Sequence, residues 1–191
     1  SVDAGNLVAK IYDSLSDAYA KAADLNDIRI QQSLNMLIVR LVFLMYADDT
    51  GILGKESMFQ EFLERRTPQD IRQGLSELFK VLNTKEDERD PFLSDEYKQF
   101  SYVDGGMFSN EDIVIPQFTP ELKDLIVNEA GKGFNWSNIS PTIFGAVFES
   151  TLNPETRRSG GMHYTSIENI HKVIDPLFLN DLRAEFDHIQ N

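Results

Sequence analysis

Cysteine is absent from the 191-residue chain. This absence excludes structural disulfides and metal sites built on thiolate ligands. It is also typical of proteins that work in a reducing compartment, so the cytoplasm is the expected location.

Basic residues are scarce, because 18 Lys and Arg stand against 31 Asp and Glu, for a net charge of −13. The electrostatic part of DNA affinity comes from Lys and Arg that displace counterions from phosphates. A surface of this charge repels a duplex on average. The densest charged run, residues 86–90, is interpreted as solvated surface.

No apolar run reaches the roughly 20 residues that a bilayer-spanning helix needs. The most apolar one, residues 34–47, contains Arg40. No signal peptide is visible. We therefore expect a buried helix and no membrane partner.

Enough apolar residues are present for a packed core, since 41% of the chain is hydrophobic and 13 residues are Phe. Their helical spacing predicts a first helix over residues 7–22. A second helix is expected to begin after Asn26 or Asp27 and to end near Asp49, where Gly51 supplies the stop. It is apolar on nearly all sides, which predicts the central helix of the fold.

Further helix starts are marked by hydroxyl residues. Ser94 is expected to begin a short helix. Three others combine a hydroxyl N-cap with proline at the first helical position, and they are Thr67-Pro68, Thr119-Pro120 and Ser140-Pro141.

Two short segments indicate β-structure. Residues 102–108 hold Asp-Gly-Gly between apolar residues, which predicts a tight turn and a small hairpin. Residues 113–116 are the other strand-like run. The expected fold class is therefore mainly α, a multi-helix, bundle-like domain with at most a small β-hairpin.

A polar loop at residues 159–166 is the most informative motif. It contains His163, Tyr164 and Thr165, and Thr165 stands three residues before Glu168 as in a capping box. A capped helix N-terminus is a common place to hold a polar or anionic ligand. The helix predicted over residues 167–186 is apolar on one side, so we expect it to pack on this chain or on a second copy in a homo-oligomer.

Five blocks of sequence, taken in order, resemble the MmeI-like family of single-chain bacterial type II restriction–modification enzymes. The resemblance covers roughly residues 34–183. The blocks are residues 37–52 (LIVRLVFLMYADDTGI), 78–84 (LFKVLNT), 100–108 (FSYVDGGMF), 136–148 (WSNISPTIFGAVF) and 155–166 (ETRRSGGMHYTS).

The resemblance implies a domain organisation. Family members join a nuclease, a helical spacer sometimes labelled helicase-like, an adenine-specific DNA methyltransferase and a target-recognition domain. Residues 1–158 resemble the spacer, and residues 159–191 resemble the N-terminal edge of the methyltransferase domain, truncated here. Related phage-defence methyltransferases share this edge, so a nuclease need not be present in the parent. The implied partners are other domains of the same chain, which would contact the DNA.

The resemblance also implies a partial S-adenosylmethionine site. Tyr164 is expected to contact the apolar or aromatic part of the cofactor, Thr165 to form a hydrogen bond, and His163 is a weaker candidate. The glycine-rich cofactor loop is expected beyond residue 191. The Asn-Pro-Pro-aromatic motif that grips a flipped adenine is absent from this sequence. We therefore expect no catalytic residue here, no methyl transfer by this chain alone and no bound cofactor.

Two other functions stay open on the sequence. The main alternative is an acidic helical module that binds a basic partner, without any link to methyl transfer. The other is a metal-dependent nuclease built on Asp90, Glu96 and Lys98, although these residues are better interpreted as the charged start of a surface helix.

Three polar features need separate interpretations. Asp48 and Asp49 are interpreted as solvated carboxylates at a helix end, and His171 with Asp175 as a local surface pair, rather than as metal sites. Arg40 lies inside an apolar helix, where an unpaired charge is costly. We expect Arg40 to pair with a carboxylate from another helix, with Glu149 as one candidate.

Overall fold

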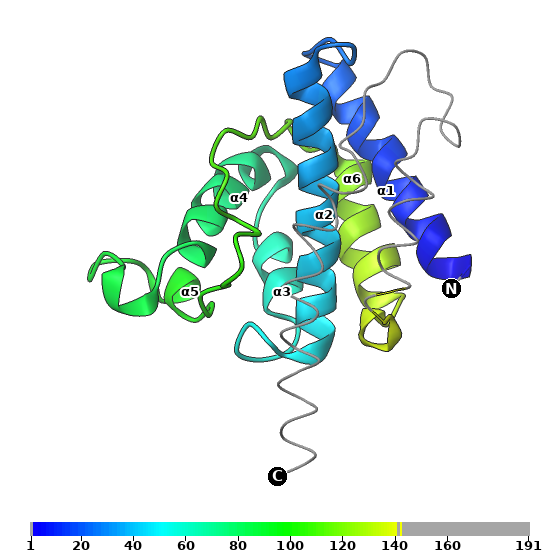
Figure 1. Cartoon of the computed structure of the whole chain (residues 1–191). Coiled ribbons are helices and arrows are strands. Elements are labelled where there is room, and N and C mark those ends of the chain that lie inside the picture. The colour runs from blue at the N-terminus through cyan, green and yellow to red at the C-terminus, as the bar shows by residue number, and fades with distance from the viewer. Residues whose placement is uncertain (1, 141, 143–191) are drawn as a thin grey trace.

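The computed structural model describes residues 2–140 and 142, which are helical and contain no β-strand (Figure 1). The mainly α fold class is therefore confirmed. The elements are α1 (Val2–Ala20), α2 (Ile28–Thr50), α3 (Met58–Glu64), α4 (Pro68–Leu82), η1 (Glu86–Glu88), α5 (Asp95–Lys98), α6 (Pro120–Asp124), η2 (Leu125–Lys132) and η3 (Trp136–Asn138).

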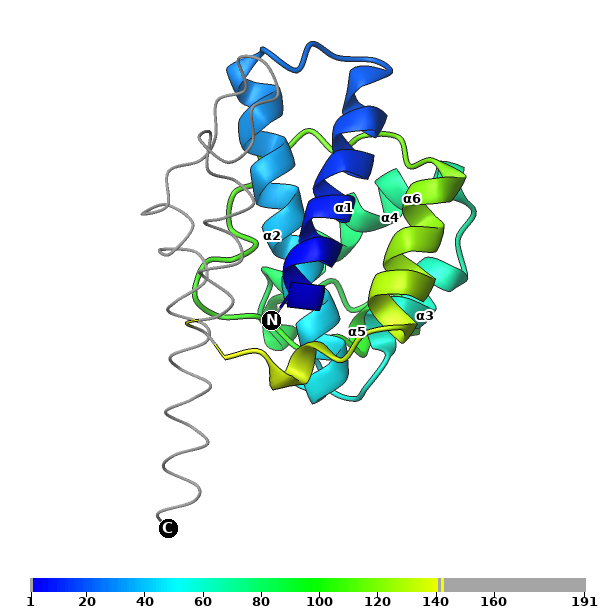
Figure 2. The same ribbon diagram turned by 90° about the vertical axis from the view of Figure 1, so that its right-hand side faces the viewer.

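Helices α1 and α2 lie side by side and run in opposite directions (Figures 1 and 2). The Asp27 carboxylate caps α2 by accepting the Arg29 backbone N–H at 2.9 Å. Gly51 ends α2 in the left-handed region, at φ 76°. Both predicted boundaries of the second helix are thus confirmed, with Asp27 rather than Asn26 as the cap.

Helix α2 is the centre of the fold. It has the length and composition to cross a bilayer, yet 83% of its most apolar window is buried inside the structure. Its neighbours include α1, α3 and η3. This agrees with the central, buried helix predicted from its apolar faces.

The structure tests most of the helix starts that were predicted from hydroxyl residues. Thr67 precedes α4 and Thr119 precedes α6, each with proline in the first turn, and Ser94 precedes α5. The helix expected after Ser140 lies outside the described residues. Helix α3 carries no comparable motif in the sequence and was not anticipated.

Helix α6 continues directly into η2, which has π-helical hydrogen bonding. The Thr119 hydroxyl caps the N-terminal end by accepting the Leu122 N–H at 3.0 Å. At the other end the Gly133 N–H donates to the Asn128 carbonyl at 2.8 Å. The Thr119-Pro120 pair predicts the start of this element, but the sequence does not predict the change from α to π.

The hairpin expected around residues 102–108 does not form. Gly105 and Gly106 adopt φ of 97° and 82°, so the predicted turn is present, but no strand pairs beside it. Helix side chains hold the later backbone instead. Val114 donates its N–H to the Ser33 hydroxyl at 2.9 Å, and its carbonyl accepts the Tyr19 hydroxyl at 2.5 Å. Because those groups are already bonded, residues 113–116 stay extended without a partner strand.

Candidate functional site

The predicted cofactor residues His163, Tyr164 and Thr165 lie outside the residues that the structure describes. The same holds for Glu149, for the His171–Asp175 pair and for the helix expected over residues 167–186. Their proposed roles, and the homo-oligomer based on that helix, stay predictions. The chemistry that the structure does describe is concentrated at the polar residues of α2.

Arg40 joins the middle of α2 to a distant loop. Its side chain is 1% exposed. The Arg40 Nε donates to the Met107 carbonyl at 3.1 Å, and an Nη donates to the Asn110 carbonyl at 2.8 Å. The guanidinium carbon also lies 4.8 Å from the ring centre of Phe79 and 5.3 Å from that of Phe108, a cation–π geometry.

The charge of Arg40 is thus met by carbonyl dipoles and aromatic faces. Burial lowers the pKa of Arg40 to about 10, which leaves the guanidinium charged at neutral pH. Among residues 2–140 and 142, no carboxylate forms an ion pair with Arg40. The expected pairing with Glu149 concerns a residue beyond this range and stays a prediction.

Asp48 caps the neighbouring helix α3 from the end of α2. One carboxylate oxygen accepts the N–H of Phe59 and the other accepts the N–H of Gln60, both at 2.8 Å. The residue directly before α3, Ser57, gives no side-chain cap and has φ 65°. Burial raises the pKa of Asp48 to about 7, while the two N–H donors oppose that shift.

Asp49 joins the end of α2 to η3. Its carboxylate accepts the backbone N–H of Trp136 at 2.7 Å. The Trp136 indole N–H in turn donates to the Ala130 carbonyl at 2.8 Å, and its ring packs edge-on against Phe134. The interpretation as solvated carboxylates is therefore wrong for Asp48, which is buried, whereas Asp49 is partly exposed and also binds a backbone N–H of another element.

These anchors bring the sequence blocks together. Helix α2 carries the first block, Phe79 belongs to the second, Met107 and Phe108 to the third, and Trp136 begins the fourth. Arg40 contacts the second and third blocks, and Asp49 binds the fourth. Segments far apart in the sequence are thus fixed by one helix.

The family model "MmeI, helicase spacer domain" matches residues 32–108. This part of the chain is therefore similar to the spacer domain of MmeI. The resemblance drawn from the sequence blocks is therefore confirmed, and the Arg40 anchor, with the Met107 carbonyl and the rings of Phe79 and Phe108, lies inside the matched range. The Asp49–Trp136 contact joins the matched range to a residue beyond it.

Two relatives extend this comparison. "DNA methyltransferase A" of Bacillus subtilis (strain 168) is 35% identical over 188 residues, covering 97% of this chain and 20% of the relative. A solved structure of the type IIL restriction–modification enzyme MmeI in complex with DNA matches with a TM-score of 0.66 and 33% identity. That match covers 100% of this chain and 24% of the other. The chain thus spans about a fifth to a quarter of the length of these relatives.

The residues considered for a nuclease centre form ion pairs and hydrogen bonds with neighbouring residues. Glu96, in the first turn of α5, pairs with Arg65 at 3.3 Å and also with Arg66. Asp90 accepts the Phe92 N–H, and Lys98 donates to the Pro91 carbonyl. Within the described part of the chain, no group of three His, Cys, Asp or Glu residues is placed to hold a metal ion.

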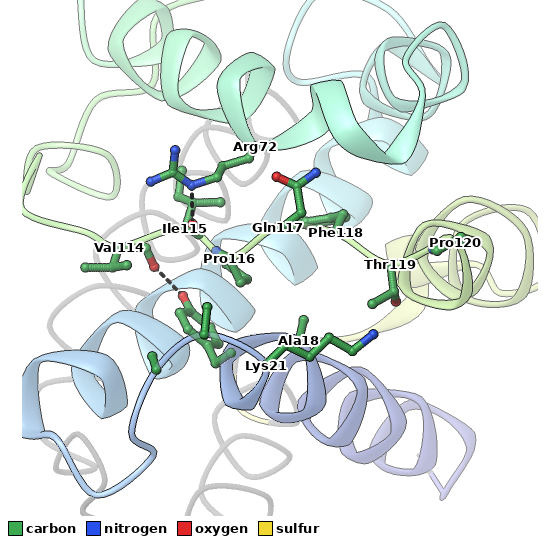
Figure 3. A pocket seen from close by; sticks show the side chains of 13 residues that line it. Ala18, Lys21, Arg72, Val114, Ile115, Pro116, Gln117, Phe118, Thr119 and Pro120 are labelled. Carbon is green, nitrogen blue, oxygen red and sulfur yellow. Dashed lines mark hydrogen bonds between the residues drawn. The ribbon is translucent and has the colours of Figure 1, made fainter.

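A groove of about 490 Å³ lies where α1, α4 and the extended segment 114–120 meet. Figure 3 shows Arg72 on one side of that segment and Ala18 and Lys21 on the other. The Arg72 Nε donates to the Ile115 carbonyl at 2.7 Å. Burial raises the pKa of the Tyr19 hydroxyl, which also binds this segment. These bonds show that the groove residues hold the segment in place.

Sequence reasoning missed several of these roles. Arg40 was recognised because a charge interrupts an apolar run, but its acceptors are backbone carbonyls, which no pattern of side chains reveals. Asp48 and Asp49 follow each other at the end of a helix, which is a common surface pattern. Their contacts with α3 and η3 depend on how the helices pack.

Proposed function

We propose that the chain is a section of a bacterial, cytoplasmic DNA restriction–modification protein. Residues 1–158 serve as its spacer, and residues 159–191 form the N-terminal edge of an adenine-specific DNA methyltransferase domain. The similarity to DNA methyltransferase A carries this proposal, because it extends over 188 residues, far beyond the spacer match that ends at residue 108.

The geometry of α2 supports a role in orienting domains. The element η3 lies at the end of α2, where the Asp49–Trp136 bond holds it. The elements α6 and η2 lie beside α1 (Figures 1 and 2). Trp136 is further fixed through its indole N–H. This fixed contact between the end of α2 and η3 gives the spacer a rigid part, which supports a role in orienting the domain that follows it.

The cofactor of the complete protein is proposed to be S-adenosylmethionine, as a methyltransferase relative implies. Tyr164 contributes an aromatic face, Thr165 a hydrogen bond, and His163 a further contact. Aromatic faces suit a ligand that contains a purine, and a capped helix N-terminus suits a carboxylate. DNA contacts are assigned to other domains, in keeping with the charge of −13.

A methyl-transfer assay tests this function. The complete protein is incubated with DNA and labelled S-adenosylmethionine, and we expect label on adenine. In the same protein, Tyr164→Ala is expected to raise the KM for S-adenosylmethionine by about tenfold, equal to about 1.4 kcal/mol. Tyr102→Ala, at a partly buried tyrosine of the spacer domain, is expected to leave KM unchanged. Absence of label on adenine contradicts the proposal.

A further inference from the structure

Phe92 is the most exposed large apolar side chain among the residues that the structure describes. Phe92 is 92% exposed, whereas the other phenylalanines that the structure describes are buried or partly buried. It lies between η1 and α5, in the segment that projects at the left of Figure 1. We call residues 84–94 the Phe92 loop. A fully exposed aromatic residue is a typical anchor for another protein surface.

The Phe92 loop is held firmly by Arg89. The Arg89 guanidinium donates to three backbone carbonyls, those of Thr84, Val81 and Phe100, at 2.7–2.9 Å. These bonds tie the loop to the end of α4 and to the segment after α5. Burial lowers the pKa of Arg89, yet an arginine stays charged after such a shift.

Further bonds fix the loop next to Phe92 itself. The Asp90 carboxylate accepts the Phe92 N–H at 2.9 Å, and Lys98 donates to the Pro91 carbonyl at 3.0 Å. The Glu86 carboxylate accepts the Tyr102 N–H at 2.9 Å. The aromatic ring is thus presented on a preorganised loop, which lowers the ordering cost of binding.

The charge around Phe92 selects the kind of surface it fits. Residues 85–95 contain five carboxylates and two basic residues, and one of those two, Arg89, is occupied by carbonyls. Asp87, Glu88 and Asp95 are exposed. Such a surface repels phosphate groups and is complementary to Lys and Arg. Nucleic acids and anionic membranes are therefore poor partners for this loop.

We propose that the Phe92 loop docks on a basic surface of another domain in the same polypeptide, with the Phe92 ring in an apolar hollow bordered by Lys and Arg. This inference rests on the proposed function, because the occupant is a neighbouring domain of a multidomain protein. The docked loop gives the spacer a fixed contact with that domain, in addition to the covalent connection along the chain.

Site-specific photo-crosslinking in the complete protein tests the proposal. The photoreactive residue p-benzoylphenylalanine replaces Phe92, and mass spectrometry identifies the crosslinked peptide. The same replacement at Ile28, which is 57% exposed at the start of α2, serves as the matched control. We expect position 92, but not position 28, to crosslink to a Lys- and Arg-containing segment of another domain.

Added salt and charge reversal test whether the docking depends on the acidic residues of the Phe92 loop. The crosslink yield at position 92 should fall severalfold between about 0.05 M and about 1 M salt, because exposed ion pairs are screened. The double variant Asp87→Lys/Glu88→Lys should reduce the yield by about tenfold at low salt. Both positions are exposed, so neither change disturbs the core.

Several outcomes overturn the docking proposal. These are crosslinking to a second copy, to a separate protein or to nucleic acid, and a yield at position 92 no higher than at position 28. The methyl-transfer assay reports separately on the proposed function. A protein that methylates adenine without the crosslink overturns the docking proposal alone, and one that crosslinks without methylating overturns the methyltransferase assignment alone.

Discussion

The carboxylate of Asp49 accepts a hydrogen bond from the backbone N–H of Trp136, 87 positions later in the chain. Asp49 is at the end of the central helix, and Trp136 begins the last described element. Through this contact the central helix also fixes the position of η3. The same helix uses Asp48 to cap α3 and Arg40 to hold residues 107–110.

Arg40→Met should destabilise the protein by about 1–3 kcal/mol, because it leaves the buried Met107 carbonyl and the partly buried Asn110 carbonyl without their donor. Urea unfolding measures the change. Arg29→Met is the control, since the pair of Arg29 with Asp112 is exposed and should contribute at most about 1 kcal/mol. Equal losses in the two variants would argue against a structural role for the Arg40 anchor.

Asp48→Ala should destabilise α3 by about 1–3 kcal/mol, because the N–H groups of Phe59 and Gln60 lose their acceptor. Hydrogen exchange is the direct readout. The amides of these two residues should exchange faster in the variant, while amides in the middle of α1 change less. Unchanged protection at Phe59 and Gln60 would show that Asp48 is not the cap.

Stability should depend on pH through Asp48. Burial raises its pKa from an ordinary value of 3.8 to about 7, so between these values the folded protein binds more protons than the unfolded chain. The free energy of unfolding should therefore rise as the pH falls from about 8 to about 5. Burial also raises the pKa of Asp49, which acts with the same sign.

Asp48→Asn isolates this contribution. The free energy of unfolding of this variant should change less than that of the unsubstituted protein between about pH 5 and about pH 8. Asp112→Asn changes an exposed position, so its free energy of unfolding should vary with pH as in the unsubstituted protein. The lowered pKa values of Glu77 and Glu96, caused first by hydrogen bonds from Tyr97 and Arg66, act with the opposite sign and at lower pH. An unchanged slope in Asp48→Asn would contradict the assignment.

Two glycine variants should change stability in opposite directions. Gly51→Ala places a Cβ at φ 76° and should cost about 1–2 kcal/mol. Gly5→Ala lies within α1, where an added Cβ meets no atom within 4 Å, and should add about 0.5–1 kcal/mol. Thermal unfolding of both variants compares them. A stabilising Gly51→Ala would show that α2 does not end in the left-handed region.

The positions of the main helices could be predicted from local patterns. Apolar periodicity gave α1 and α2, and the hydroxyl–proline pairs gave the starts of α4 and α6, because caps and proline act within one turn of the chain. Helix α3 escaped prediction because its cap, Asp48, comes from another helix. The hairpin was predicted wrongly because the Asp-Gly-Gly turn is local, whereas the bonds that occupy its flanking backbone are not: the Val103 N–H donates to the Leu82 carbonyl, and the Met107 carbonyl accepts from Arg40.

The family could also be predicted, because it depends on ordered blocks of sequence. The Arg40 site was predicted only in part, since the burial of a charge is visible in an apolar run while its carbonyl acceptors are not. The docking residue Phe92 gave no signal, because an exposed phenylalanine cannot be distinguished from a buried one by residue type. The cofactor residues His163, Tyr164 and Thr165 remain predictions.

The central claim is that this spacer leads directly into a methyltransferase domain. Titration of S-adenosylmethionine into two forms of the protein, one of residues 1–191 and one extended beyond residue 191, tests it most directly by calorimetry. We predict binding by the extended form, weakened by Tyr164→Ala, and none by the shorter form. Absence of binding to both forms would contradict the account.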